Sequence, residues 1–136
     1  MQISVKREEI LDGISITKII DKKFKTNVIK VMFITELSEN DSPLNTFISM
    51  LATSTNSKIK TNFEMSDKLN ALYDSTFRAN TVTYGDSQII EFTIGCIDNK
   101  FSLYGEDILG QLLEILEDSL FAPNVSCGKY DEDEFR

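Results

Sequence analysis

The stretch FRANTVTYGDSQIIEFTIGCI, residues Phe77 to Ile97, decides the fold. Both halves are rich in β-branched and aromatic residues, and the second half alternates apolar side chains with Glu91 and Thr93, which is the period of a strand with one covered face. Gly85-Asp86-Ser87 between the halves provides a tight turn. The stretch therefore predicts an antiparallel hairpin with strands Phe77 to Tyr84 and Gln88 to Ile97.

Two further strands are predicted upstream. Gly13 to Asp21 (GISITKIID) mixes β-branched and polar residues at period two, and Val28 to Leu37 (VIKVMFITEL) follows after the polar residues Lys22 to Asn27. Both faces of the Val28 to Leu37 segment carry apolar side chains. We therefore expect it to be a central strand that is covered on both sides.

Three helices are predicted from apolar residues at helical spacing. The first runs from about Pro43 to Thr53, with Ser42 as its cap, and the second is short, capped by Ser66, and ends before Asp74. The third, Glu106 to Phe121, is amphipathic over four turns. The inward stripe expected for the first helix is Leu44, Phe47, Ile48, Leu51 and Ala52.

The connecting segments and the order of the elements predict the architecture. Thr53 to Asn62 is rich in Ser, Thr and Asn, so we expect a solvated loop that is free to move or to meet a partner. Asp131 to Arg136 has the composition of the acidic first turn of another helix, so residues 1–136 are expected to be one piece of a larger domain. The order predicts an α+β two-layer sandwich, with a largely antiparallel sheet and helices on one face.

The charge balance and the lack of apolar runs limit the partners. The formal net charge of −8 disfavours nucleic acid, and the small basic patch Lys22, Lys23 and Lys25 is interpreted as a solvated turn or strand edge. No apolar run approaches the roughly 18 residues of a membrane span, and the start of the chain does not resemble a signal peptide. We expect a cytoplasmic protein that does not enter a membrane.

The sequence lacks the residues that several kinds of catalysis and ligand binding require. The chain has no histidine, which removes histidine acid–base catalysis and most zinc sites, and it has no glycine-rich phosphate loop. Cys96 and Cys127 lack the short spacing of a structural zinc site, and two cysteines are too few for a disulfide framework. Acidic pairs such as Asp107 with Glu114 are interpreted as the wet face of the third helix. We therefore predict no catalytic, cofactor-binding or metal-binding residue.

Three segments, together with the element order, resemble the N-terminal domain of pitrilysin/insulinase-type zinc peptidases, the inverzincins. These segments are Lys22 to Leu37 (KKFKTNVIKVMFITEL), Leu69 to Phe77 (LNALYDSTF) and Gly105 to Pro123 (GEDILGQLLEILEDSLFAP). The resemblance spans roughly residues 13–136 and is strongest to bacterial non-catalytic members associated with modification of elongation factor P. It implies the metallohydrolase-like fold of mitochondrial processing peptidases.

The resemblance also implies that the zinc site of the family is lost. Placing the HxxEH helix on Pro43 to Thr53 puts Asn45, Ile48 and Ser49 where histidine, glutamate and histidine would stand. An amide, an aliphatic chain and a hydroxyl cannot replace zinc-binding imidazoles or the carboxylate base. The third ligand of the family would fall near or beyond the tail, where Glu134 would be only a surface acid.

The expected function follows from a chain that keeps the fold of the resembled family but lacks its zinc-binding side chains. The leading hypothesis is a non-catalytic subunit that pairs as a heterodimer with an active zinc peptidase homologue and helps to form a peptide chamber. The alternative is a stand-alone module that binds peptide along a sheet edge, with its acidic surface favouring basic peptides. Self-association is a third possibility for a piece of a larger protein. An enzyme that uses carboxylates alone has no motif to support it.

Overall fold

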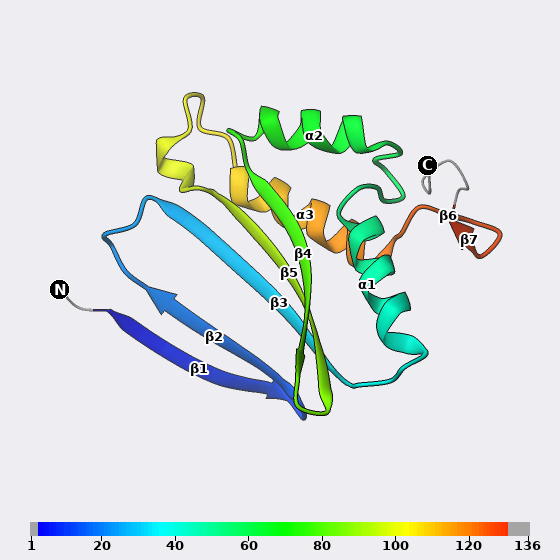
Figure 1. Cartoon of the computed structure of the whole chain (residues 1–136). Coiled ribbons are helices and arrows are strands. Elements are labelled where there is room, and N and C mark those ends of the chain that lie inside the picture. Colours follow the sequence, from blue (N-terminus) through cyan, green and yellow to red (C-terminus); the bar gives the residue numbers. More distant parts are fainter. Residues whose placement is uncertain (1–2, 131–136) are drawn as a thin grey trace.

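The computed structural model describes residues 3–130 and contains a helix-covered sheet with a separate N-terminal hairpin (Figure 1). The strands are β1 (Ser4–Leu11), β2 (Ile14–Ile20), β3 (Thr26–Glu36), β4 (Thr76–Tyr84), β5 (Ser87–Ile97), β6 (Val125–Ser126) and β7 (Lys129–Tyr130). The helices are α1 (Asp41–Ala52), α2 (Asn62–Ala71) and α3 (Ile108–Phe121), with a short 3-10 helix, η1 (Asn99–Phe101), before α3.

The two strands of the predicted hairpin, β4 at an edge and β5 in the centre, belong to the main sheet. Its order is β3-β5-β4, with all neighbours antiparallel, and Ile94 of β5 lies opposite Ile29 of β3 and Phe77 of β4. Gly85 has a φ of 58° in the turn between β4 and β5, a left-handed conformation that glycine adopts without a steric penalty. The hairpin prediction is therefore confirmed.

One face of this sheet carries all three helices (Figure 1), and the core lies between the two layers. Strand alternation directs Phe77 of β4 and Phe92 and Ile94 of β5 toward the helices. From the helix layer, the core receives Ala52, Met65, Leu72, Ile108, Leu112, Ile115 and Leu116. The predicted two-layer α+β architecture, with helices on one face of an antiparallel sheet, is confirmed.

The segment Val28 to Leu37, which was predicted to be a central strand covered on both sides, forms part of β3. That prediction is wrong. Within residues 3–130, β3 pairs with β5 only, so it is an edge strand of this sheet. The side chains of Val28, Met32 and Ile34 alternate onto the uncovered face and remain 62%, 56% and 70% exposed. Apolar residues on both faces of a strand therefore do not establish that both faces are covered.

Helix α1 is confirmed, but its predicted cap is wrong and its predicted inward stripe is correct for only two of its five residues. The helix begins at Asp41, its N-cap residue is Asn40, and no side chain caps it, so Ser42 lies inside the first turn. Leu51 and Ala52 are buried, whereas Leu44, Phe47 and Ile48 lie at the surface. The buried polar residue Ser49 shows that this helix packs on a face that is less apolar than the sequence stripe.

Helix α2 and the loop before it also differ from prediction. Thr61, not Ser66, is the N-cap residue, and its hydroxyl accepts a hydrogen bond from the Glu64 N–H at 3.1 Å. The segment predicted as a solvated loop is anchored: the side chain of Asn56 is fully buried and donates to Ser119 Oγ at 3.2 Å, and the Ser57 N–H donates to the Ala122 carbonyl at 2.8 Å.

The amphipathic helix α3 is confirmed, with a start at Ile108 rather than Glu106. Asp107 is the N-cap residue, and its carboxylate accepts from the Gly110 N–H at 3.0 Å. On the apolar side of this helix Leu112 and Leu116 are buried, but Leu113 is 40% exposed. The two short strands β6 and β7 were not predicted, and the helix expected at Asp131 to Arg136 lies outside the described residues.

Residues 3–20 form the β1–β2 hairpin, which we call the arm. The strand at Ser4–Leu11 was not predicted, because its centre, Lys6 to Glu9, is charged. The arm extends along one side of the molecule, on the left in Figure 1, with its residues exposed throughout both strands. It is a separate two-stranded sheet in the described part of the chain.

Candidate functional site

Asn45, one of the three positions that the sequence resemblance aligns with the zinc motif, lies on the side of α1 that meets the β4–β5 hairpin. There Asn45 donates from Nδ2 to Gln88 Oε1 at 3.0 Å, and Gln88 in turn donates from Nε2 to the Ser42 carbonyl at 3.0 Å. The hydroxyls of Thr46 and Thr81 are hydrogen-bonded at 3.0 Å. We call these five residues the α1 polar cluster.

The three positions predicted from the sequence, Asn45, Ile48 and Ser49, lie in different surroundings. Asn45 is half-buried in the α1 polar cluster, and Ser49 is buried and donates from Oγ to the Thr46 carbonyl of its own helix at 2.7 Å. Ile48 is 46% exposed, so its side chain is not part of the core. The helix brings the three positions to neighbouring places at spacing i, i+3, i+4, as the sequence predicted.

The chemistry at these positions is that of a structural hydrogen-bond network. A buried amide or hydroxyl is costly unless its hydrogen bonds are made, and Gln88, which is 3% exposed, meets this requirement through Asn45 and Ser42. In residues 3–130, no three His, Cys, Asp or Glu side chains are grouped so that they could hold a metal ion. The arrangement links α1 to the sheet through amide and hydroxyl groups.

A second polar site, missed by sequence reasoning, joins the end of α2 to the segment before α3. The Tyr73 hydroxyl donates to the Glu106 carboxylate at 3.0 Å and accepts from the Leu103 N–H at 2.8 Å. The Leu103 N–H lowers the pKa of Tyr73, but desolvation and Glu106 outweigh it, so the pKa of this hydroxyl is raised above its ordinary value. Hydrogen bonding from its own backbone N–H and from Tyr73 lowers the pKa of Glu106.

The acidic residues around α3 are used in capping and pairing. The Gly110 N–H and the Asn99 amide lower the pKa of Asp107, and Asp118 forms an ion pair with Lys58 at 2.8 Å. Glu114 and Glu117 are exposed. The prediction that these acids form the wet face of the helix is therefore confirmed, except that Asp107 and Asp118 have specific structural partners.

The two cysteines lie in different environments. Cys96 is buried on the core side of β5 and Cys127 is exposed, and both are free thiols. Burial raises the pKa of the Cys96 thiol, which makes it a poor nucleophile at neutral pH. Cys96 is therefore a core residue rather than a reactive thiol.

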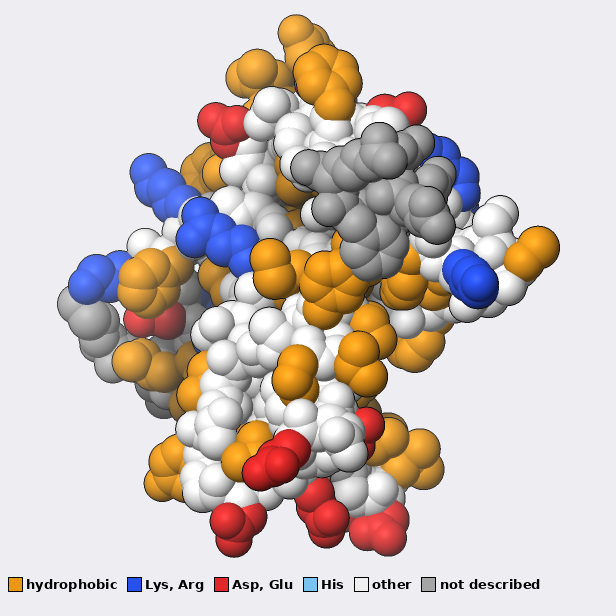
Figure 2. Space-filling model, turned by 45° about the vertical axis from the view of Figure 1, so that its right-hand side comes forward, with side chains coloured by type: hydrophobic (Ala, Val, Ile, Leu, Met, Phe, Trp, Pro, Cys, Tyr) orange, Lys and Arg blue, Asp and Glu red, His pale blue; other side chains and the backbone are white. Residues whose placement is uncertain are grey.

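The surface is divided by charge and by polarity. Figure 2 shows acidic side chains gathered at the lower end of one face, with hydrophobic side chains spread over its middle and top. The exposed apolar residues include Leu44, Phe47 and Ile48 of α1 and Phe63 of α2. In residues 3–130 no helix has both the length and the apolar character needed to cross a membrane.

Comparisons with known proteins identify a fold relative. No family model matches the chain, and no curated protein matches it. Among solved structures, the crystal structure of a conserved protein from Enterococcus faecalis V583 is similar, with a TM-score of 0.88 and 21% sequence identity. The match covers 96% of this chain and 31% of that chain, so this chain spans about a third of the length of its structural relative. At this identity the similarity establishes a shared fold and nothing about activity.

Proposed function

We propose that this chain is part of a catalytically inactive peptidase-like protein that acts as the partner subunit of an active zinc peptidase homologue. The proposal combines the sequence resemblance to pitrilysin/insulinase-type peptidases with the state of α1. At the three ligand positions this helix carries Asn45, Ile48 and Ser49. The protein keeps the framework and lacks the metal chemistry.

The observation that carries the proposal is the use of Asn45 and Ser49 in hydrogen bonds within the α1 polar cluster and the helix. Asn45 joins α1 to Gln88 of β5, and Thr46 joins it to Thr81 of β4, so the helix is held on the sheet without a metal. A maintained surface without catalytic groups suits a protein that shapes a chamber. The exposed side chain of Ile48 is then available to line it.

The alternative function, peptide binding along a sheet edge, is favoured by one observation. Strand β3 has 11 residues and, in the described part of the chain, a second edge that pairs with no strand. An extended peptide could add to this edge through main-chain hydrogen bonds. Titration with short basic peptides distinguishes the two functions. Tight binding by the chain alone is expected only if the chain is a stand-alone peptide-binding module.

The deciding experiment measures zinc content and peptide cleavage for the chain alone and after mixing with an HxxEH-bearing homologue from the same genome. The expected result is no stoichiometric zinc and no cleavage by the chain alone, together with a stable complex and increased cleavage in the mixture. Stoichiometric zinc or cleavage by the chain alone would overturn the proposal. So would the absence of a complex with every such homologue of that genome.

A pair of variants tests whether α1 faces the shared chamber. Ile48→Lys changes an exposed residue of α1, and Phe63→Lys makes the same change on α2, where the side chain is 73% exposed. We expect Ile48→Lys to alter cleavage by the mixture while complex formation is retained, and Phe63→Lys to leave cleavage unchanged. Equal effects of the two variants would remove α1 from the chamber.

A further inference from the structure

Helix α1 has its polar side toward the sheet and an apolar side toward the solvent. Asn45, Thr46 and Ser49 lie on the side toward the sheet, and the first two are hydrogen-bonded to β5 and β4. The opposite side, which we call the α1 outer face, consists of residues that are each at least 41% exposed: Leu44, Phe47, Ile48 and Met50. A surface helix normally turns its apolar side to the core. An exposed apolar face of this kind is typical of a surface that another molecule covers.

The shape of the α1 outer face suits a second helix. Leu44 and Ile48 are four residues apart, so their side chains form a ridge along the helix. Such ridges pack into the grooves of a neighbouring helix, with the two axes about 8–10 Å apart. The 12 residues of α1 are about 18 Å long. The face therefore fits a partner helix of about three turns.

The beginning of α1 is surrounded by acidic side chains. Residues 31–57 contain no Lys or Arg and three exposed acidic residues, Glu36, Glu39 and Asp41. The exposed residue Asp86 lies beside them, because its carbonyl accepts from the Leu37 N–H at 2.8 Å. Figure 2, in which the right-hand side of Figure 1 is turned forward, shows acidic side chains gathered at the lower end. We call these four residues the acidic end, and it attracts a partner with positive charge.

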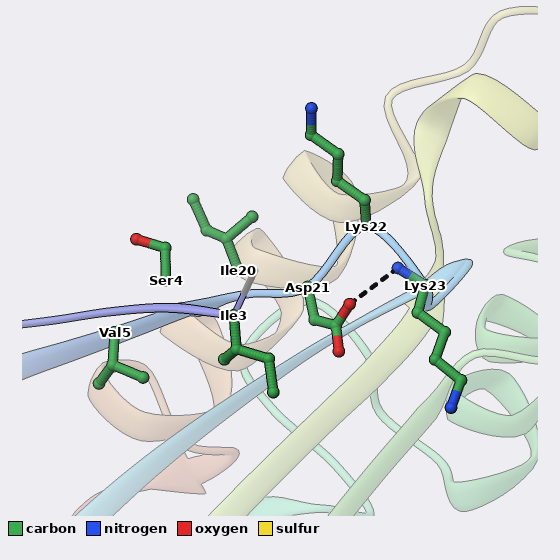
Figure 3. Close-up of a pocket in the computed structure, with 7 residues that line it drawn as sticks. All are labelled: Ile3, Ser4, Val5, Ile20, Asp21, Lys22 and Lys23. Carbon is green, nitrogen blue, oxygen red and sulfur yellow. Dashed lines mark hydrogen bonds between the residues drawn. The ribbon is translucent and has the colours of Figure 1, made fainter. Parts of the chain in front are cut away.

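The basic patch of the same chain, Lys22, Lys23 and Lys25, lies at the far end of the sheet. Figure 3 shows Lys22 and Lys23 at the base of the arm, around a hollow where β2 runs into the turn before β3. Strand β3 then extends over 11 residues, about 35 Å, before it reaches the acidic end. A second copy of the chain carries the same acidic end and a formal net charge of −8, so charge opposes its approach. These observations favour a different protein as the occupant.

We propose that the α1 outer face is a docking site for a helix of another protein. This partner helix is apolar along the contact and carries Lys or Arg side chains where it meets the acidic end. The site is separate from the open edge of β3, because α1 packs on β4 and β5, and β4 lies at the opposite edge of the sheet. The proposal goes beyond the subunit role proposed above, because it requires no zinc peptidase.

The test measures binding of a designed probe to this chain by fluorescence anisotropy. The probe is a labelled peptide of about 18 residues that forms an amphipathic helix, with leucines on one side and lysines on the other. One control peptide carries glutamates in place of the lysines, and another carries serines in place of the leucines. We expect both control peptides to bind at least about tenfold more weakly than the probe, because each lacks one of the two required properties.

Variants on α1 and matched variants on α2 locate the binding site. Leu44→Lys on the α1 outer face is matched by Phe63→Lys on α2, and Glu39→Lys at the acidic end is matched by Asp67→Lys on α2; all four residues are exposed. For the probe, we expect the dissociation constant to rise at least about tenfold with Leu44→Lys and about threefold with Glu39→Lys. The α2 variants should change it by less than about twofold.

Further readouts separate docking on α1 from other causes of binding. Thermal unfolding verifies that each variant is folded, and Met50→Lys provides a second change on the α1 outer face. Equal weakening by the α1 and α2 variants would show a general attraction between opposite charges and would overturn the proposal. So would equal binding of the probe and the glutamate peptide, or no binding of the probe. A dimer of the chain alone that Leu44→Lys dissociates in sedimentation equilibrium would assign the face to a second copy instead.

Discussion

The body and the arm use similar residues with opposite results. Ile94 in the body is 1% exposed, whereas Ile16 in the arm is 55% exposed, although both lie in β-branched strand sequences. The difference arises from what covers them: three helices lie on the sheet that contains Ile94, and no element of residues 3–130 lies on the arm. Strand patterns therefore predict the local backbone, and the surrounding layers decide which strands contribute stability.

The largest expected effect comes from deleting a core side chain in the body and its counterpart in the arm. Leu112 of α3 is fully buried, so Leu112→Ala is expected to destabilise the fold by about 3 kcal/mol through lost burial and a cavity. Ile19→Ala in the arm should change stability by less than about 0.5 kcal/mol. Urea unfolding at low protein concentration measures both. Similar losses for the two variants would show that the arm is packed in solution.

The next effect tests the anchored loop, Thr53 to Asn62, which is rich in polar residues but contains the fully buried Asn56. The Asn56 carboxamide oxygen accepts from the Lys58 and Ile59 N–H groups at 2.9 and 2.8 Å. Asn56→Ala leaves these donors without their partner and should destabilise by about 2 kcal/mol. Ser57→Ala, at the exposed neighbour, should have little effect. Equal stability of the two variants would indicate that the loop is not anchored by this side chain.

The elements that were predicted correctly are those defined by a local sequence pattern. The β4–β5 hairpin and α3 were recovered because a turn and a periodic stripe define them within the segment itself. The edge position of β3 and the exposure of Ile48 were missed, because both depend on which other elements are present. The burial of Asn56 was missed because a segment of polar residues was assumed to be exposed to solvent.

The candidate site was predictable only in part. The three positions Asn45, Ile48 and Ser49 lie near one another because helical spacing alone brings them together. The partners of Asn45, Gln88 and Ser42, depend on packing between α1 and β5, which one sequence does not reveal. The peptidase relationship itself stays a prediction, since the structural relative shows the fold alone.

A smaller effect concerns the pH dependence of the body. The pKa of Glu106 is lower than its usual value near 4.5 in the folded protein, because its own backbone N–H and Tyr73 hydrogen-bond to the carboxylate. The unfolded chain therefore takes up this proton first, so the stabilisation is complete above the unfolded pKa and is lost as the pH falls through the folded value.

Acid unfolding of a Glu106→Gln variant measures this contribution. The stability difference between wild type and variant should be greatest near neutral pH and should shrink as the pH falls below about 4.5. Tyr73→Phe removes the hydroxyl donor and should reduce the acid dependence in the same direction. If wild type and Glu106→Gln lose stability in parallel from neutral to acid pH, the link between α2 and the segment before α3 contributes nothing through this carboxylate.

The smallest expected effect separates conformation from contact at two neighbouring residues. Tyr73 and Asp74 both adopt left-handed backbone conformations, with φ of 59° and 56°. Asp74 is exposed, so Asp74→Gly should relieve the steric cost at little loss of contact and stabilise the fold by about 0.5 kcal/mol. Tyr73→Gly relieves the same cost but removes the hydroxyl that joins Glu106 and Leu103, so it should destabilise. Thermal unfolding in which both glycines stabilise would mean that strain outweighs the Tyr73 hydrogen bonds; a loss with Asp74→Gly would mean that the turn is not strained.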